Sequence, residues 1–478
     1  MKRLTLIHQN DLHGHVEPHW ELGWHAGRPE AWRSGGAARI AAMANAIRAE
    51  VRGACIHVDS GDAIHGTGAA QWTRGAAIVP VLNAMRVEVM TPGNWEFAYG
   101  PALLRERVAE MAFPIIAANV RRADTGEREF PASYIREAGN VRAAFIGVTS
   151  PIVATTMPQP FGAGLRFDDA VEVLPEVIAS IREQERPDVV VLLSHYGFAQ
   201  EVSIARAIEG IDVILGGHTH DVLAEPVMVG RTIVTQSGAH GSYLTRLDLE
   251  LSHGRVCAVK HQLLRVDDGE IDRHVDEVVR DALRPHAPAL EEVIGETSTL
   301  LHRGTVLEAP ADTMIVRAYL AATGADVALS HGWRYGTPIP PGPITLGDLW
   351  QLIPPNPELF TVALSGAELR RMLERSLERT FAGNALRQQG GYVMRFDGMS
   401  AIARLNNPAG DRVMQLEVAG NPVDPARSYV VAAAGDQSVP PREARRMTGL
   451  RAVDVVREQL QRDGARLCQP APPSLVAV

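Results

Sequence analysis

The chain has 478 residues, which is too many for one hydrophobic core and indicates two or three domains. Its content of 46% hydrophobic and 22% charged residues is typical of a globular protein and excludes a disordered or fibrous chain. The 47 basic and 56 acidic residues give a net charge of −9, so we expect no nonspecific binding to nucleic-acid polymers or to membranes.

The three cysteines, Cys55, Cys257 and Cys468, are scattered and form no CxxC pair, which argues against a disulfide scaffold or a thiolate metal cage. No apolar run reaches the roughly 18 residues that cross a bilayer, and the first residues do not form a signal peptide. We expect a cytoplasmic protein if the sequence begins at its native N-terminus, and a periplasmic or extracellular one if that end was trimmed.

Short β-branched runs alternate with helical patterns up to about residue 265, which predicts an α/β domain. The predicted strands cover residues 4–7, 55–58, 87–90, 115–118, 143–148, 189–193, 213–215 and 232–234. The predicted helices cover residues 168–185 and 37–51, and the second of these places on one face Ile40, Met43, Ala44 and Ile47.

The pattern changes at residues 268–295, where a connecting helix and linker are predicted before Pro285 and Pro288. One face of this helix would carry Ile271, Val275, Val278, Ala282 and Leu283. A second α/β region follows, with an amphipathic helix near residues 366–379 and a Pro-rich tail, residues 469–478, that we expect to be loose. The predicted domains are therefore 1–267 and 296–478, joined by 268–295.

Polar motifs follow five of the predicted strands, at the point where each strand ends. They are Asp11-Leu12-His13, Gly61-Asp62, Gly93-Asn94, Ser194-His195 and Gly217-His218-Thr219-His220. Because ligands of open α/β sheets bind beyond the carboxyl ends of strands, we expect these side chains to share one rim. Carboxylate, amide and imidazole groups without a thiolate favour manganese, zinc, iron or cobalt, and two such ions can share a carboxylate and hold a nucleophilic hydroxide.

Each motif alone has a simpler interpretation. A lone histidine at a strand end is commonly a hydrogen-bonded structural residue, and Gly-Asp or Gly-Asn pairs are commonly turns. The occurrence of all five motifs, each after a predicted strand, favours a site for two divalent metal ions.

These motifs resemble those of the metallophosphoesterase superfamily, and the run from His8 to Gly14 resembles its 5′-nucleotidase branch. In the second half, Gly332-Trp333-Arg334, the run 341–345 and the run 364–369 resemble the 5′-nucleotidase C-terminal domain. The resemblance implies a four-layered α/β/β/α metal domain, a long linking helix and a smaller α/β domain that binds substrate.

The resemblance also implies roles for individual residues. One divalent ion, manganese or zinc, would be held by Asp11, His13 and His220. The second ion would be held by Asn94, His195 and His218, and Asp62 would bridge the two. Catalysis would then depend on Asp62, Asn94 and His195. Arg334 would bind the anionic group of the substrate with its planar guanidinium, and the weaker alternative is a surface arginine.

One motif departs from the family. Where the family has Gly-Asn-His-Glu-Phe-Asp, this chain has Gly93-Asn94-Trp95-Glu96-Phe97-Ala98. The absent His and Asp help to protonate the leaving group, and general acid–base catalysis typically contributes about 10²–10⁴-fold. The loss matters for a ribose alkoxide but little for a thiolate or another stabilised anion. His240 and His65 are alternative candidates for supplying a proton.

A second resemblance follows from this departure. The runs Trp72-Thr73-Arg74-Gly75, Trp95-Glu96-Phe97 and Gln388-Gln389-Gly390-Gly391 are similar to SoxB thiosulfohydrolases. Those enzymes use two manganese ions to release sulfate from a cysteine S-thiosulfonate on a carrier protein. The chain differs from them at Asn94, where that branch is expected to have another ligand, and in having no visible export signal.

The nucleotide interpretation also has a gap. Relatives that bind nucleotides place the base between two aromatic rings, whereas the run 432–439 has none. The candidates to replace the missing ring are Trp333, Tyr335, Phe381 and Tyr392, and for each of them packing in the core is the favoured alternative. Three hypotheses remain open. They are a phosphoesterase acting on a nucleotide or related phosphoester, a SoxB-like thiosulfohydrolase with a sulfur-carrier protein as partner, and a metal-binding protein with little catalysis.

Overall fold

The computed structural model describes residues 1–334, 336–389, 391–436, 439 and 444–478. Contacts divide the chain into two units, the first of which contains Met1–His19, Arg33–His65 and Ala69–Pro285. The second unit contains Trp20–Trp32, Gly66–Gly68 and His286–Val478. The division after Pro285 falls within the segment 268–295, which is the segment predicted to connect the domains. Among the described residues, no helix combines the length and apolar character that a membrane span requires.

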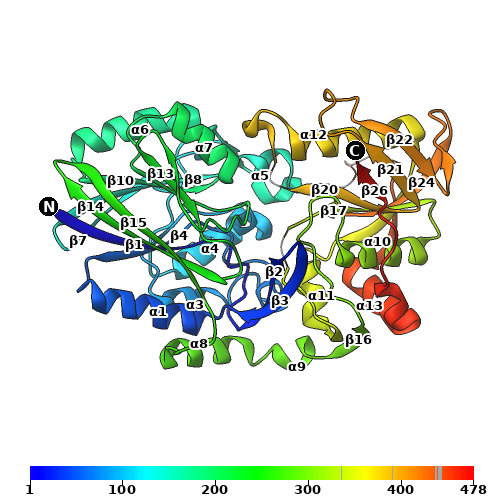
Figure 1. The fold of residues 1–478 in the computed structure, drawn as a ribbon, viewed down its shortest axis with the longest axis horizontal. Coiled ribbons are helices and arrows are strands. Elements are labelled where there is room, and N and C mark those ends of the chain that lie inside the picture. The colour runs from blue at the N-terminus through cyan, green and yellow to red at the C-terminus, as the bar shows by residue number, and fades with distance from the viewer. Residues whose placement is uncertain (335, 390, 437–438, 440–443) are drawn as a thin grey trace. The chain divides into compact units, whose positions relative to one another are not determined.

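Two sheets form the centre of the first unit (Figure 1). One has the strand order β15 (Arg255–Arg265), β14 (Tyr243–Ser252), β1 (Lys2–Gln9), β4 (Cys55–Asp59) and β5 (Val89–Met90). The other has the order β12 (Val227–Val229), β13 (Thr232–Gln236), β11 (Val213–Gly216), β10 (Val189–His195), β8 (Val141–Thr149) and β7 (Ser133–Ala138). Strands β1, β4 and β5 are parallel, as are β13, β11, β10 and β8, so their carboxyl ends meet at one edge of each sheet.

Side chains alternate between the two faces of these strands. Leu4 and Leu6 of β1 share one core with Val191 and Val213 of the other sheet, so the sheets pack face to face. Helices α1 (Ala37–Glu50), α3 (Val79–Met85), α4 (Pro101–Glu110) and α8 (Arg273–Leu283) cover the outer face of the first sheet. The outer face of the second sheet is covered by α6 (Ala170–Gln184) and α7 (Phe198–Ala207). The predicted four-layered α/β/β/α arrangement is confirmed.

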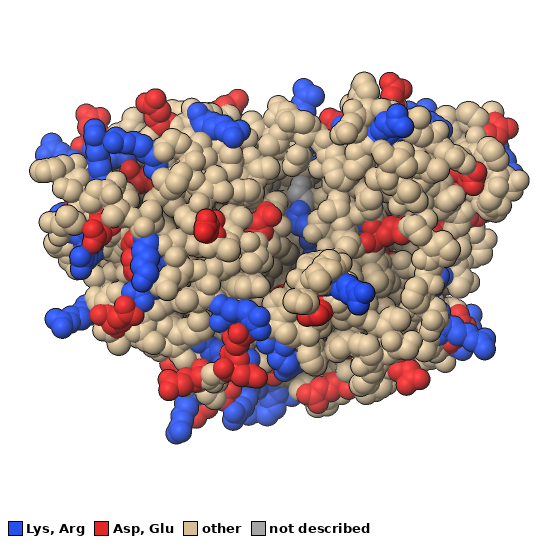
Figure 2. Space-filling view, in the orientation of Figure 1, with Lys and Arg blue, Asp and Glu red and all other residues tan. Residues whose placement is uncertain are grey.

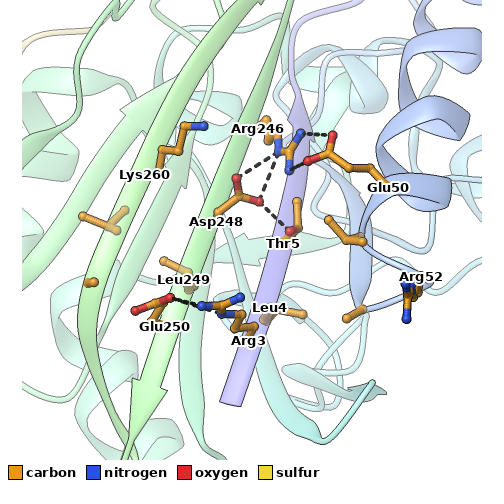
Figure 3. A pocket seen from close by; sticks show the side chains of 14 residues that line it. Arg3, Leu4, Thr5, Glu50, Arg52, Arg246, Asp248, Leu249, Glu250 and Lys260 are labelled. Carbon is orange, nitrogen blue, oxygen red and sulfur yellow. Dashed lines mark hydrogen bonds and ion pairs between the residues drawn. The ribbon is translucent and has the colours of Figure 1, made fainter. Parts of the chain in front are cut away.

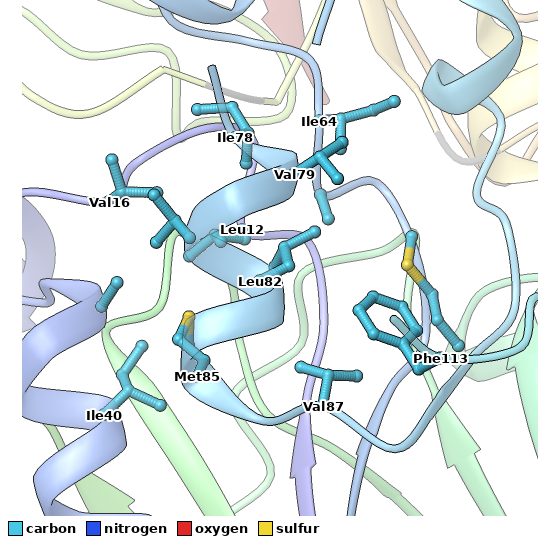
Figure 4. Packing of buried hydrophobic residues seen from close by; sticks show 14 of the residues in the cluster. Leu12, Val16, Ile40, Ile64, Ile78, Val79, Leu82, Met85, Val87 and Phe113 are labelled. Carbon is cyan, nitrogen blue, oxygen red and sulfur yellow. The ribbon is translucent and has the colours of Figure 1, made fainter. Parts of the chain in front are cut away.

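The packing between α1, α3 and the first sheet also anchors a predicted site motif. Figure 4 shows Leu12 among Ile40 of α1 and Leu82 and Met85 of α3, and all four side chains are buried. Burying a leucine of this kind contributes about 1.5–3 kcal/mol. Because Leu12 stands between the two polar residues of the Asp-Leu-His motif, its packing fixes the backbone from which those residues project.

The second unit is a smaller α/β domain. Its five-stranded sheet has the order β20 (Tyr392–Asp397), β17 (Val327–Gly332), β24 (Ser428–Ala434), β19 (Glu358–Ser365) and β25 (Arg446–Arg451). One face packs on α10 (Pro310–Thr323) and α13 (Ala452–Asp463), and the other on α12 (Gly366–Phe381). Helix α12 begins at Gly366 because Ser365 and Glu368 form a reciprocal capping box. A second sheet contains β23 (Asn421–Pro422), β22 (Val413–Val418), β21 (Met399–Ala403) and β26 (Leu475–Ala477).

Shorter elements complete the two units. The two-stranded sheets pair β2 (His19–His25) with β3 (Arg28–Ser34), β6 (Val120–Arg122) with β9 (Leu165–Phe167), and β16 (Val293–Thr297) with β18 (Gly342–Thr345). The short helices are α2 (Gly68–Trp72), α5 (Ile152–Thr155), α9 (Ala287–Leu290) and α11 (Leu346–Leu352).

Two sequence predictions about secondary structure are wrong. Residues 115–118 are buried but form only one bridge, because their N–H groups bond to three separate segments, through Met90, Pro131 and Gly147. The tail is not loose throughout, since β26 pairs with β21 and Leu475 is buried.

The connecting helix predicted before Pro285 is α8, which ends at Leu283. The single long linking helix that the resemblance implies is absent from this segment, because the separate four-residue α9 follows Pro285. Val275 and Val279 are buried, whereas Ile271 precedes the helix and is 47% exposed. Arg284 is still helical, and its N–H donates to the Arg280 carbonyl at 2.9 Å, but the helix ends there because Pro285 has no N–H to continue the hydrogen-bond ladder.

Candidate metal centre

The loops that follow β1 and β4 lie side by side. The Asp11 N–H donates to the Gly61 carbonyl at 2.8 Å, and the His13 N–H donates to the Asp62 carbonyl at 2.8 Å. Both loops adopt unusual backbone, as does the turn after β11. Positive φ angles of 48–75° occur at five of the seven predicted ligands, namely Asp11, His13, Asp62, His218 and His220. Such backbone costs on the order of 1–3 kcal/mol per residue and is concentrated at functional sites.

Three of the predicted ligands form a first group, Asp11, His13 and His220. The Nε2 atoms of the two histidines are 3.1 Å apart, and Asp11 Oδ1 lies 3.2 Å from His220 Nε2 and 3.7 Å from His13 Nε2. Asp11 Oδ1 is buried and accepts no hydrogen bond. Nitrogen ligands about 2.1 Å from one tetrahedral ion lie about 3.4 Å apart, so this spacing fits a divalent ion.

A second group contains Asp62, His195 and His218. Asp62 Oδ2 lies 3.1 Å from His195 Nε2 and also 3.7 Å from His13 Nε2 of the first group. His195 Nδ1 donates to the Ser60 carbonyl at 2.6 Å, which directs Nε2 toward the carboxylates. The two groups are therefore contiguous, and Asp62 reaches both of them.

Electrostatic coupling in this cluster favours cations. Burial opposes charge on His195, but the Asp62 and Asp11 carboxylates raise its pKa to about 10. Burial also opposes ionisation of Asp11, but His220 and His195 hold its pKa well below the usual range. Because a ligand imidazole must be neutral, a bound divalent ion would take the place of this proton.

Asn94 lies four residues after the end of β5, whose carboxyl end is at the same edge as those of β1 and β4. Its side chain is buried, and Oδ1 accepts no hydrogen bond. Both chain neighbours contact the second group, because the Trp95 N–H donates to Asp62 Oδ1 at 2.7 Å and a Cβ on Gly93 would lie 2.2 Å from that oxygen. An amide oxygen without a hydrogen bond beside the carboxylate is suited to bind a cation.

Glu96 holds the loops after β4 and β5 together, a role that the motif analysis missed. It is buried, and its carboxylate accepts hydrogen bonds from the backbone N–H groups of Asp62, Ala63, Ile64 and Gly93 at 2.7–3.2 Å. Burial and then the adjacent Asp62 raise the pKa of Glu96 to about 7. The signal in the sequence is its position two residues after Asn94, within the Gly-Asn-Trp-Glu run.

Trp95 occupies the position at which the family has histidine. Its indole stacks on the His65 ring, with the ring centres 4.2 Å apart and the planes at 17°. Burial lowers the pKa of His65 to about 3, so this imidazole is neutral and is poorly suited to donate a proton. The other candidate donor, His240, lies beside the first group, with its ring centre 5.6 Å from that of His220.

Arg334 lies in the second unit, where its guanidinium carbon is 5.8 Å from the centre of the Tyr392 ring. Trp333 is partly buried against the core of that unit, and the Arg303 guanidinium lies 5.3 Å from its ring centre. Phe381 also packs against the core. Four positions in the motifs of this half, Tyr335, Gly390, Gln437 and Ser438, lie outside the described residues.

A cleft of about 560 Å³ lies at the start of β1, at the opposite end of the strand from Asp11. Figure 3 shows that Arg246 of this cleft pairs with Glu50 and Asp248, and that Arg3 pairs with Glu250. Charges of both signs are also interspersed on the face of the molecule shown in Figure 2. Neither this cleft nor the mixed surface charge gathers carboxylate and imidazole groups as the candidate metal centre does.

Two family models match the chain. The calcineurin-like phosphoesterase model covers residues 4–222, and the model of the 5′-nucleotidase C-terminal domain covers residues 293–435. The first contains all seven predicted metal ligands, and the second contains Arg334.

Curated relatives and solved structures agree with these models. The trifunctional nucleotide phosphoesterase YfkN of Bacillus subtilis is 27% identical over 469 residues, which are 87% of this chain but 30% of YfkN. The snake venom 5′-nucleotidase of Crotalus adamanteus is 27% identical over 87% of this chain and 76% of its own length. The structure of the sulfate thiohydrolase SoxB of Thermus thermophilus is 27% identical, with a TM-score of 0.91 over 99% of this chain and 96% of that one. The chain therefore belongs to the two-domain 5′-nucleotidase family of metallophosphoesterases, a family of metal-dependent hydrolases.

Proposed function

We propose that the chain is a two-ion hydrolase that cleaves a phosphate ester, either a nucleotide or a related small phosphoester. The observation that carries the proposal is the position of Asp62, whose Oδ2 lies 3.1 Å from His195 Nε2 and 3.7 Å from His13 Nε2. Divalent ions, in our proposal manganese or zinc, would supply a nucleophile at neutral pH and neutralise charge on the ester. The names of YfkN and the venom enzyme support a nucleotide or related ester.

In this proposal each side chain has a defined task. One ion is held by Asp11, His13 and His220, the second by Asn94, His195 and His218, and Asp62 is shared between them. The buried carboxylates concentrate negative charge where the ions bind, and the Ser60 carbonyl keeps the His195 ring in the tautomer that can bind an ion. Arg334 is proposed to bind the anionic group of the substrate.

The residues that follow Asn94 restrict which leaving groups the site can release. Trp95 cannot act as a general acid near neutral pH, Ala98 has no titratable group, and His65 is neutral, so this run supplies no acid. The other candidate donor, His240, lies against His220 and His13 of the first ligand group. We therefore propose that efficient substrates release a stabilised anion that needs no protonation, such as a nitrophenolate.

The absence of a general acid after Asn94 also favours a second candidate function, which is hydrolysis of an S-thiosulfonate carried by a protein. Sulfur is the leaving atom in that reaction and needs no general acid. The 27% identity to the SoxB structure, over nearly the whole chain, supports this candidate. A sulfur-carrier protein would then replace the small-molecule substrate as partner.

A leaving-group series tests the proposal. The manganese-loaded chain is expected to cleave 4-nitrophenyl phosphate at least about 100-fold faster than AMP, because only AMP needs the missing acid. Restoring a titratable group with Trp95→His should narrow this ratio by raising kcat for AMP. Replacing Trp95 with Phe is the matched control, because it changes the ring without adding a proton donor, and should leave the ratio unchanged.

The alternatives give different patterns in the same assay. Equal and efficient turnover of AMP and the nitrophenyl ester would contradict the absence of a leaving-group acid. Turnover of a thiosulfonate alone would select the second candidate. No turnover of any substrate by a chain with two bound ions would indicate a metal-binding protein with little catalysis.

A further inference from the structure

A buried carboxylate lies beneath the turn that carries two of the predicted ligands. Glu201, in the first half of α7, is fully buried. Its Oε1 accepts hydrogen bonds from the backbone N–H groups of Gly197 at 3.3 Å and Gly217 at 3.4 Å. Since Gly217 directly precedes His218, Glu201 holds the backbone at the point where the turn leaves β11.

Gln236, the last residue of β13, extends this contact along the turn. Its Nε2 donates to Glu201 Oε2 at 2.8 Å and to the Gly217 carbonyl at 2.9 Å. Its Oε1 accepts hydrogen bonds from Thr219 Oγ1 at 3.1 Å and from the Asp221 N–H at 3.2 Å. The held positions 217, 219 and 221 therefore alternate with the two ligand positions, 218 and 220.

The turn needs such support because its ligand residues have unfavourable backbone. His218 has a φ of 75° and His220 a φ of 59°, a region that side chains other than glycine rarely adopt. Gly216 leaves room for the carboxylate, since a Cβ there would lie 2.0 Å from Glu201 Oε2. Burial raises the pKa of Glu201 to about 8, although Gln236 and Ser194 donate hydrogen bonds to it.

We infer that Glu201 and Gln236 form a clamp, named here the Glu201–Gln236 clamp, that positions His218 and His220 and sets the affinity for both ions together. The inference rests on the proposed two-ion site. His220 belongs to the first ligand group and His218 to the second, so loosening this one turn weakens both. Hydrogen-bonded partners behind a ligand typically change metal affinity by about 10–100-fold. Glu201 and Gln236 are therefore positioning residues.

The test is a Mn²⁺ titration of the metal-free chain by calorimetry, with the number of bound ions counted by mass spectrometry. Glu201→Ala is expected to weaken both binding steps by about 10–100-fold. Glu201→Gln should also weaken both binding steps. The new side-chain NH₂ group is a donor, and it would face another donor, either Gln236 Nε2 or a backbone N–H. Adding Gln236→Glu to that variant lets the amide at position 201 donate to the carboxylate at position 236. This double variant should recover part of the lost Mn²⁺ affinity. Glu209→Gln, on an exposed side chain after α7, is the matched control.

Thermal unfolding of the metal-free variants separates positioning from stability. A purely structural role would lower the unfolding temperature and leave the Mn²⁺ affinity of the folded chain unchanged, which would overturn the inference. Weakening of one binding step alone would also overturn it. If Glu201→Ala does not fold, Glu201→Gln gives the same comparison with the side-chain volume preserved. Failure of the proposed hydrolysis is seen separately, as a wild-type chain that binds two Mn²⁺ without turnover.

Discussion

The Asp62→Asn variant is expected to bind neither ion at concentrations that saturate the wild-type chain, and its kcat should fall at least about 100-fold. Asp62 Oδ2 lies within 3.7 Å of an imidazole nitrogen from each ligand group, so one carboxylate serves both. The amide keeps the size of the side chain but removes the charge that offsets two divalent cations. Counting ions by mass spectrometry and assaying 4-nitrophenyl phosphate on the same samples checks both effects.

Asp124→Asn is the matched control for this variant. It makes the same chemical change on a side chain that is 69% exposed, so neither the metal content nor kcat should change. Wild-type metal content in Asp62→Asn would exclude Asp62 as the shared ligand. Loss of one ion alone would assign Asp62 to a single site and contradict the bridge.

The second large effect is expected in the second unit, from Asp312→Ala. Asp312 is 1% exposed and is shared by Arg303 and Arg395, which are 1% and 3% exposed. Arg303 Nε donates to Asp312 Oδ1 at 2.9 Å, and Arg395 Nε donates to Oδ2 at 3.2 Å. Removing the carboxylate leaves two buried guanidinium groups without their counter-charge. The free energy of unfolding should fall by about 3–5 kcal/mol, as measured by urea denaturation.

The control for this prediction is Asp411→Ala, on an exposed side chain, which should change the free energy of unfolding by less than about 0.5 kcal/mol. Asp312→Asn should be nearly as damaging as the alanine variant, because the volume is kept and the charge is lost. Unchanged stability in both Asp312 variants would show that backbone carbonyls, such as Leu352 O against Arg303, are sufficient partners.

The sequence predicts well which side chains gather at one edge of the sheets, because they follow strands with clear hydrophobic patterns. The runs that become β1, β4, β10 and β11 are buried, and each ends where a polar motif begins. Because ligands of α/β sheets bind beyond the carboxyl ends of the strands, these side chains can be placed at one edge without tertiary information. The boundaries of α1 and α6 were likewise predictable, because their periodic apolar positions are buried against a sheet.

Other features depend on contacts that no local pattern encodes. The hairpin of β2 and β3 carries His19 and His25, yet its sequence resembles a polar loop, because neither strand has a continuous buried face. The roles of Glu96 and Glu201 follow only from the loops that approach them in space. The same holds for the tail, where the pairing of β26 depends on a distant strand and on Glu308, which accepts hydrogen bonds from the backbone at Ser474 and Leu475.

The ligand groups draw on both central sheets, with Asp11 and His13 after β1 and His220 after β11 in the first group. An ion bound by the first group would be coordinated by residues from both sheets and would link the two sheets that pack face to face. Folding and ion binding then become thermodynamically linked, and an ion at 100 times its Kd adds about 2.7 kcal/mol to the folded state. The melting temperature should consequently rise with the logarithm of the free Mn²⁺ concentration.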